Sequence, residues 1–81
     1  MQHDQLFAGS IADNVAFFDP AMSMERVTHA AYLASIHNDI MAMPMGYQSL
    51  VGDMGSSLSG GQRQRVMLAR ALSSAETDGT G

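Results

Sequence analysis

The chain has 81 residues, enough for one small domain that buries only about 60% of its unfolded surface. Its net charge is −4 and all four basic residues are arginines, which excludes a general nucleic-acid binder because an acidic surface repels a phosphate backbone. The absence of cysteine excludes a disulfide framework and fits a cytoplasmic protein, and no apolar run approaches the roughly 18 residues that span a bilayer.

A short helix is predicted near the start of the chain, over residues 11–18. Ser10 and Asp13 have the spacing of a capping box, in which a serine hydroxyl accepts from an amide of the first turn. The expected apolar face repeats at i, i+4 and i+7 and consists of Ile11, Val15 and Phe18. The pair Asp19-Pro20 then ends the helix, because the residue before a proline avoids the α region.

A second helix is expected to begin after Ser23, another favoured N-cap. The residues spaced for its buried face are Met24, Val27, Ala30, Ala31 and Ala34. This pattern fades near His37-Asn38. Residues 39–43 then add one or two further helical turns, which Pro44 stops because proline cannot continue a helix.

The last predicted helix is preceded by a turn, a short extended piece and a loop, at residues 45–47, 48–51 and 52–57. It begins at Ser59, where Gln62 completes a capping box, and continues to Leu72. Residues 73–81 have no apolar periodicity and are predicted to be a disordered or foreign tail. These elements together predict a mainly α fold, a small helical bundle over residues 1–72.

Two glycines, Gly60 and Gly61, fall in the first turn of this helix, where glycine costs stability relative to alanine. Because they lack Cβ atoms, a ligand can approach N–H groups at the electropositive end of the helix. That combination suits an anion, and phosphate most of all. A flexible linker is the alternative interpretation of Ser59-Gly60-Gly61, but a linker would not be followed at once by a capped helix.

The last predicted helix carries three linked motifs, Leu58-Ser59-Gly60-Gly61-Gln62, Arg63-Gln64-Arg65 and Ala69-Arg70-Ala71-Leu72. Together they resemble the signature motif of ATP-binding cassette (ABC) transporter ATPases. In that family the signature serine and glycines contact the γ-phosphate of an ATP held by the opposite subunit. The resemblance therefore implies nucleotide contacts from Ser59, Gly60 and Gly61, with Gln62 supporting the turn.

The order of the earlier segments resembles the helical subdomain of an ABC ATPase, and this likeness extends over residues 1–72. Gln2, followed by Leu6-Phe7 and by residues 10–15, resembles the family's Q-loop and the helix after it. The resemblance implies that, in an intact protein, Gln2 approaches the magnesium ion and the attacking water.

A second loop of the family is matched just before the signature, by Val51, Gly52, Asp53, Met54 and Gly55. The resemblance implies that this loop takes part in coupling to the membrane domain. Exporters more often have Val-Gly-Glu-Arg-Gly here, so a role that needs the arginine does not carry over to Met54. Together with residues 43–47, this stretch resembles the peptidase-containing bacteriocin and colicin V exporters.

The resemblance implies an intact protein that couples hydrolysis of ATP, with Mg²⁺, to export, with a peptide or bacteriocin as cargo. The implied partners are a second ATP-loaded nucleotide-binding domain, a RecA-like core, and the coupling helix of a membrane domain at the cytoplasmic face of the inner membrane. The 81 residues contain no lysine and therefore no phosphate-binding loop, and no apolar strand ending in aspartate follows Leu72. We therefore expect a truncated, frameshifted or designed fragment that binds no cofactor and hydrolyses no ATP alone.

Alternatives stay open at several positions. Residues 59–62 can instead belong to a free-standing helical module that binds an anion or a partner protein. The apolar residues near the start either belong to the core or line a groove for the coupling helix; they are Leu6, Phe7, Phe17 and Phe18. His29 and His37 are eight residues apart, which is a poor spacing for a helical metal pair, so no metal site is expected.

Overall fold

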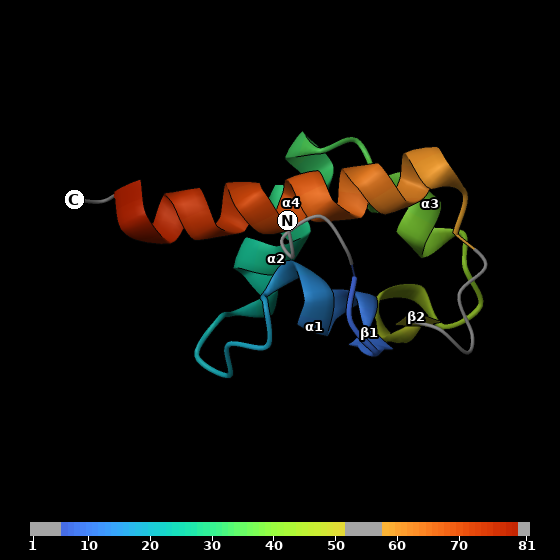
Figure 1. Cartoon of the computed structure of the whole chain (residues 1–81), viewed down its shortest axis with the longest axis horizontal. Helices are drawn as coiled ribbons and strands as arrows, with labels where there is room; N and C mark the ends of the chain where they lie inside the picture. The colour runs from blue at the N-terminus through green and yellow to red at the C-terminus, as the bar shows by residue number, and fades with distance from the viewer. Residues whose placement is uncertain (1–5, 52–57, 80–81) are drawn as a thin grey trace.

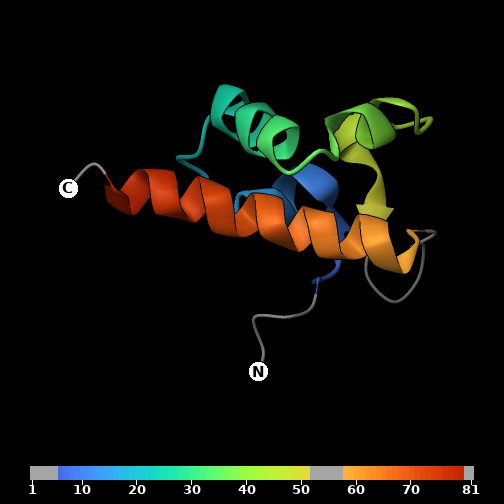
Figure 2. The same ribbon diagram turned by 90° about the horizontal axis from the view of Figure 1, so that it is seen from above.

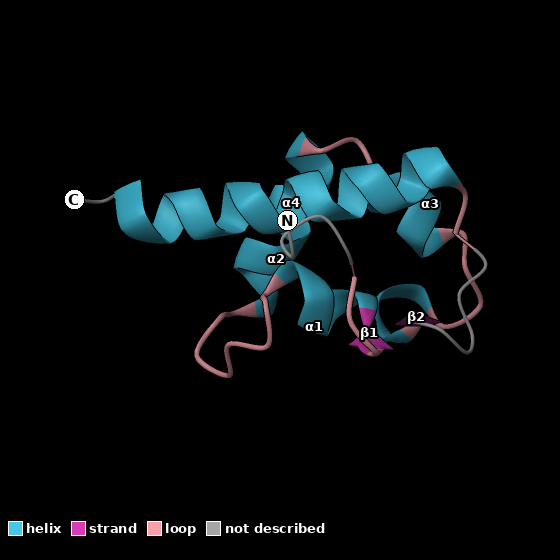
Figure 3. Cartoon of the chain, in the orientation of Figure 1, coloured by secondary structure: helices cyan, strands magenta, loops and turns pink. Residues whose placement is uncertain are grey.

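The computed structural model describes residues 6–51 and 58–79, with side chains through residue 74. In chain order its elements are β1 (Gly9–Ser10), α1 (Ile11–Val15), α2 (Met24–Leu33), α3 (His37–Met41), a 3₁₀ turn η2 (Gly46–Gln48), β2 (Leu50–Val51) and α4 (Gly60–Gly79). Figure 3 shows that helices dominate this arrangement, so the predicted mainly α fold is confirmed.

The longest helix, α4, is the element against which α1 and α2 pack. It contacts both α1 and α2, and Figure 1 shows α1 beneath its middle. Turned by 90°, the molecule shows α2 along one side of α4, with α3 near the N-terminal half of α4 (Figure 2). The start of α4, which carries the predicted nucleotide contacts, therefore lies on the side of the bundle where α3 is found.

The core lies where α4 meets the earlier helices. Its fully buried large apolar side chains are Ile11, Val15, Val27, Ile36, Ile40 and Val66. Small side chains are also buried and let the helices approach closely; they include Ala30, Ala31, Ala34 and Ala69. The predicted apolar face of α2 is thus confirmed except at Met24, which is 47% exposed in the first turn.

The predicted N-caps of the first two helices are confirmed. The Asp13 amide donates to Ser10 Oγ at 2.9 Å, and the Arg26 amide donates to Ser23 Oγ at 3.2 Å. Each serine hydroxyl thereby satisfies one of the amides that a helix start leaves without an intrahelical partner.

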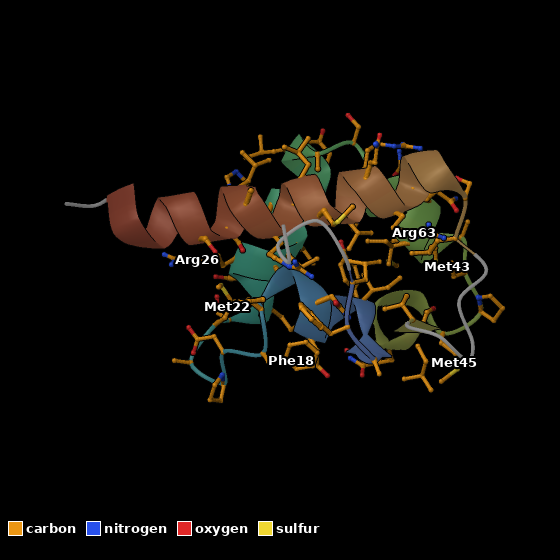
Figure 4. The ribbon with its side chains drawn as sticks, viewed as in Figure 1. Phe18, Met22, Arg26, Met43, Met45 and Arg63 are labelled. Carbon is orange, nitrogen blue, oxygen red and sulfur yellow. The ribbon has the colours of Figure 1, made fainter. Side chains whose placement is uncertain are left out.

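The end of α1 differs from the prediction, because the helix stops at Val15 and not at Phe18. The Phe17 amide donates to the Asn14 carbonyl at 3.1 Å and the Phe18 amide to the Asp13 carbonyl at 2.8 Å, which is a Schellman motif. Phe17 and Phe18 both have positive φ angles, 53° and 61°. Phe18 is 45% exposed at the edge of the molecule (Figure 4), so its predicted place on the buried face was wrong.

The predicted end of the second helix near His37 was also wrong, because α2 stops at Leu33. Ser35 has a φ angle of 61°, and the Ile36 amide donates to the Ala31 carbonyl at 2.9 Å, which forms a second Schellman motif. Ile36 is thereby directed into the core, and α3 begins directly after it. A serine in the left-handed conformation replaces the usual glycine, which is why the sequence carried no visible stop signal.

A two-stranded antiparallel ladder joins β1 and β2, with Gly9 opposite Val51 and Ser10 opposite Leu50. The extended conformation at Leu50–Val51 was predicted, whereas β1 was not. Gly9 has a φ angle of 149°, and a Cβ atom there would lie 3.0 Å from the ring of Phe18. The positive φ angle and this close approach of the Phe18 ring both favour glycine at position 9.

The prediction that the last helix stops at Leu72 was wrong, because α4 continues to Gly79. Ser73 is fully buried, and its hydroxyl donates to the carbonyl oxygen of Val15 at 2.9 Å. This contact explains why a polar residue occupies the buried position 73, since its hydroxyl satisfies a carbonyl of α1. The domain division at residue 72 stays a prediction.

Two groups of predicted functional residues lie outside the described parts of the chain, namely Gln2 and residues 52–55. Among the helices of residues 6–51 and 58–79, none has both the length and the apolar character needed to cross a membrane.

Candidate functional site

The start of α4 is closed by a reciprocal capping box. The Gln62 amide donates to Ser59 Oγ at 3.1 Å, and the Ser59 amide donates to Gln62 Oε1 at 2.9 Å. The predicted cap is therefore confirmed. A hydroxyl has one donor and two acceptor positions, so Ser59 can accept from Gln62 and still donate its own proton to an acceptor outside the chain.

Gly60 and Gly61 lie exposed in the first turn of α4. A Cβ atom at position 60 would meet nothing within 4 Å, and one at position 61 would meet only Arg65 Nη2, at 3.9 Å. Among the described glycines, positive φ angles occur at Gly9 and Gly46 and not at this turn. The fold therefore has no steric or conformational need for glycine at positions 60 and 61.

The amides of this turn are not equivalent. The Gln62 N–H is used by Ser59 Oγ, and the Arg63 N–H donates to the Ser59 carbonyl at 2.9 Å. Those of Gly60 and Gly61 precede the first intrahelical bonds, at the end of the helix where the dipole is positive. Ser59 Oγ and these two amides are thus the donors that the turn can offer to an anion.

A polar network joins this turn to α3. Gln62 Nε2 donates to Asp39 Oδ2 at 3.0 Å, and Arg65 Nη2 lies 3.7 Å from the same oxygen. Arg65 also donates to two carbonyl oxygens, from Nη1 to Ser35 at 2.8 Å and from Nε to Gly61 at 3.3 Å. No local sequence pattern connects Asp39 with Gln62, because the two residues are 23 positions apart.

A second, buried polar cluster fastens α4 to α1. Arg70 is only 7% exposed; its Nε donates to the Asn14 carbonyl at 3.1 Å and its Nη2 lies 3.3 Å from Asn14 Oδ1. The guanidinium carbon is 5.5 Å from the ring centroid of Phe7 and 5.1 Å from that of Phe17. Burial lowers the pKa of the Arg70 guanidinium below its usual value, because desolvation disfavours the charged form.

The remaining predicted site residues are dispersed. Val51 is 5% exposed in β2, so its side chain belongs to the core. Leu6 and Phe7 are partly buried, whereas Phe17 and Phe18 are 50% and 45% exposed. Among the described residues, no three histidine, aspartate or glutamate side chains lie together in a way that would hold a metal ion.

Comparison with known proteins matches residues 1–77 to the ABC transporter family model. The chain is 50% identical over 72 residues to the colicin V secretion/processing ATP-binding protein CvaB of Escherichia coli. It is 53% identical over 72 residues to the toxin RTX-III translocation ATP-binding protein of Actinobacillus pleuropneumoniae, and 50% identical to the alpha-hemolysin translocation ATP-binding protein HlyB of Proteus vulgaris. Each match covers 89% of this chain and 10% of the relative. With nearly its whole length matched by the family model, the chain belongs to the ABC transporter family.

Proposed function

We propose that this chain is the helical signature segment of an exporter's ATP-binding domain, in which Ser59, Gly60 and Gly61 donate to the γ-phosphate of an ATP bound by a second such domain. The observation that carries this proposal is the pair of exposed glycines that the fold does not require. Glycine in the first turn of a helix lowers its stability relative to alanine, and it is favoured where a ligand must approach the backbone closely.

The chemistry of the turn supports phosphate as that ligand. A γ-phosphate presents several negatively charged oxygens, and charge-assisted hydrogen bonds to them are roughly twice as strong as neutral ones. The Ser59 hydroxyl and the amides at positions 60 and 61 are donors at the positive end of a 20-residue helix. The Gln62 N–H is already used by Ser59 Oγ, and the role proposed for Gln62 is to hold Ser59 in the cap.

The function of the whole protein is proposed from the relatives, of which this chain spans about a tenth. Their names describe secretion or translocation of colicin V and of toxins. We infer that the intact protein couples hydrolysis of Mg²⁺-bound ATP to export of a peptide or protein toxin at the cytoplasmic face of the membrane. In the intact protein, Gln2 approaches the Mg²⁺ ion and the attacking water. Residues 51–55 transmit the closure of the two ATP-binding domains to the coupling helix of the membrane domain.

The exposed aromatic pair after α1 is proposed as part of the coupling surface. Phe17 and Phe18 are each about half exposed and are held in the left-handed conformation, which costs roughly 1 kcal/mol per residue. Strained, exposed aromatic side chains are typical of surfaces that contact a partner. Their exposure therefore favours a groove for the coupling helix over a place in the core. It also favours a segment of a larger assembly over a free-standing module that binds an anion.

The experiment that tests the nucleotide contact is a chimera of the Escherichia coli colicin V secretion/processing ATP-binding protein. In this chimera, the segment that matches the present chain is replaced by the present sequence. We expect Mg²⁺-dependent ATP hydrolysis by the purified chimera, and Ser59→Ala is expected to lower its rate by about 100-fold, the size of effect seen when a transition-state donor is removed.

The matched control is Gln64→Ala, an exposed residue of the same helix outside the cap. This substitution is expected to leave the rate within about twofold. Equal rates for Ser59→Ala and the unaltered chimera would contradict the proposal. The 81-residue chain alone is expected to release no phosphate from Mg²⁺-ATP, because it contains no lysine to build a phosphate-binding loop.

A further inference from the structure

The side-chain amide of Gln62 has two chemically different ends, and each faces a different partner. Its oxygen accepts from the Ser59 amide at 2.9 Å, and its nitrogen donates to Asp39 Oδ2 at 3.0 Å. An ionised carboxylate only accepts hydrogen bonds, so the Asp39 contact can be made only by the nitrogen end. With the nitrogen committed to Asp39, the oxygen is the end left for Ser59.

The reverse orientation of the amide would be repelled at both ends. It would place the NH₂ group against the Ser59 N–H and the amide oxygen against the Asp39 carboxylate. Without the carboxylate, only the Ser59 N–H would oppose the reverse orientation, and the acceptor of the cap would be held less firmly. Asp39 therefore reinforces the orientation of Gln62 that the cap requires.

Asp39 is itself held in place by the surrounding fold. The next residue, Ile40, is fully buried and anchors α3 in the core. Arg65 Nη2 lies 3.7 Å from the carboxylate, although both side chains are about one-third exposed and such a pair contributes little alone. Arg65 Nη1 also donates to the Ser35 carbonyl at 2.8 Å, which ties the first two turns of α4 to the residues between α2 and α3.

We propose that Asp39 is a positioning residue for the nucleotide-contacting turn: through Gln62 it holds the Ser59 backbone and hydroxyl in the orientation that meets the phosphate. The inference rests on the proposed function of Ser59. Through Asp39, α3 keeps the start of α4 in one conformation before the second ATP-binding domain binds.

The first test uses the 81-residue chain and hydrogen exchange at the Ser59 amide, together with NMR signals of the Gln62 NH₂ group. Asp39→Asn keeps the shape but replaces the acceptor-only group by an amide that tolerates either end of Gln62. We expect exchange at Ser59 to become roughly fivefold faster and the Gln62 NH₂ signals to move toward solvent-exposed values. The double variant Asp39→Asn/Gln62→Glu exchanges donor and acceptor, and it is expected to restore slow exchange at Ser59.

Arg63→Gln serves as the control, because it removes a positive charge from an exposed position of the same helix and leaves the Asp39–Gln62 hydrogen bond. It is expected to change Ser59 exchange by less than about twofold. If Asp39→Asn leaves the Ser59 and Gln62 signals unchanged, or if Arg63→Gln reproduces its full effect, the positioning role of Asp39 is wrong.

The second test places Asp39→Asn in the chimera and measures kcat and KM for ATP hydrolysis. We expect kcat to fall by roughly fivefold with Asp39→Asn and to be largely retained with Asp39→Glu, which keeps the carboxylate. Asp13→Asn removes the same charge from an exposed position of α1 and is expected to have no effect. A loss of rate with Ser59→Ala but not with Asp39→Asn would overturn this inference alone, whereas no loss with Ser59→Ala would overturn the proposed function.

Discussion

Arg70 and Asn14 are bonded across 56 residues of sequence, with 3.1 Å between Arg70 Nε and the Asn14 carbonyl oxygen. Asn14 is fully buried, and its side-chain amide makes every hydrogen bond available to it. Its nitrogen donates to the carbonyls of Phe7 and Ser10 at 2.8 and 2.9 Å, and its oxygen accepts from the Phe7 amide at 2.8 Å and from Arg70. The hydrogen bonds of Asn14 and Arg70 therefore hold α1, the segment before α1 and α4 in a fixed relative position.

Replacing Arg70 is therefore expected to destabilise the chain strongly. Arg70→Met keeps much of the length of the side chain but leaves the Asn14 carbonyl and Oδ1 without this donor, and it removes the cation that lies over the Phe7 and Phe17 rings. We expect the free energy of unfolding in urea to fall by about 2–4 kcal/mol. Arg63→Met, at an exposed position of the same helix, should change it by less than about 0.5 kcal/mol. Similar losses for both variants would contradict the assigned role of Arg70.

Gly60 and Gly46 offer a matched pair for the glycine argument, because a Cβ atom would meet nothing within 4 Å at either position. Gly46 has a φ angle of 54° and Gly60 lies in a helix. Gly60→Ala should therefore raise the free energy of unfolding by about 0.5 kcal/mol, while Gly46→Ala should lower it by about 1 kcal/mol. Thermal unfolding of the 81-residue chain measures both changes.

In the chimera, the same Gly60→Ala variant should hydrolyse ATP at least tenfold more slowly, because the added methyl group stands where the γ-phosphate must approach. A Gly60→Ala variant that is both more stable and fully active would show that no nucleotide comes close to position 60.

Stability at high pH is expected to depend on Tyr47. Its hydroxyl lies 2.7 Å from His37 Nδ1, and burial raises the pKa of the phenol above its ordinary value of about 10. The folded chain then retains a proton that the unfolded chain has lost, so this contribution is complete below pH ~10 and is lost as the pH rises toward the folded pKa. Urea unfolding should show a free energy that falls with pH in this window.

Tyr47→Phe is expected to abolish that slope and to cost about 1 kcal/mol at neutral pH, because His37 Nδ1 loses its partner. Tyr32→Phe is the control, since Tyr32 is 69% exposed. If the free energy of unfolding of Tyr47→Phe still falls with pH above ~10 as it does in the unaltered chain, another group causes the loss of stability.

The sequence was sufficient for features that depend on neighbours three or four residues apart. The caps at Ser10, Ser23 and Ser59 were predicted because each is a local exchange between a hydroxyl and a nearby amide. The apolar face of α2 follows from the same periodicity. Both Schellman motifs were missed, because Phe17 and Ser35 take a left-handed conformation that these residue types rarely adopt.

The contacts that position the candidate site could not be predicted, because they join residues far apart in the sequence. Asp39 meets Gln62 over 23 residues, and Arg70 meets Asn14 over 56. Each of these side chains has an ordinary surface role when it is considered alone. Only the folded arrangement of α1, α3 and α4 brings these side chains together, and that arrangement is set by the whole core.

Ser73 is the clearest example of such a long-range partner, and it leads to a last prediction. Its hydroxyl donates to the Val15 carbonyl at 2.9 Å and lies 3.0 Å from the Arg70 carbonyl, in a fully buried position. Ser73→Ala should therefore lower the free energy of unfolding by about 1–2 kcal/mol, because the Val15 carbonyl would lose this donor away from water. The neighbouring Ser74 is exposed, and Ser74→Ala should change the free energy by less than about 0.5 kcal/mol. Urea unfolding compares the two variants directly, and equal stabilities would mean that α4 does not pack on α1 beyond Leu72.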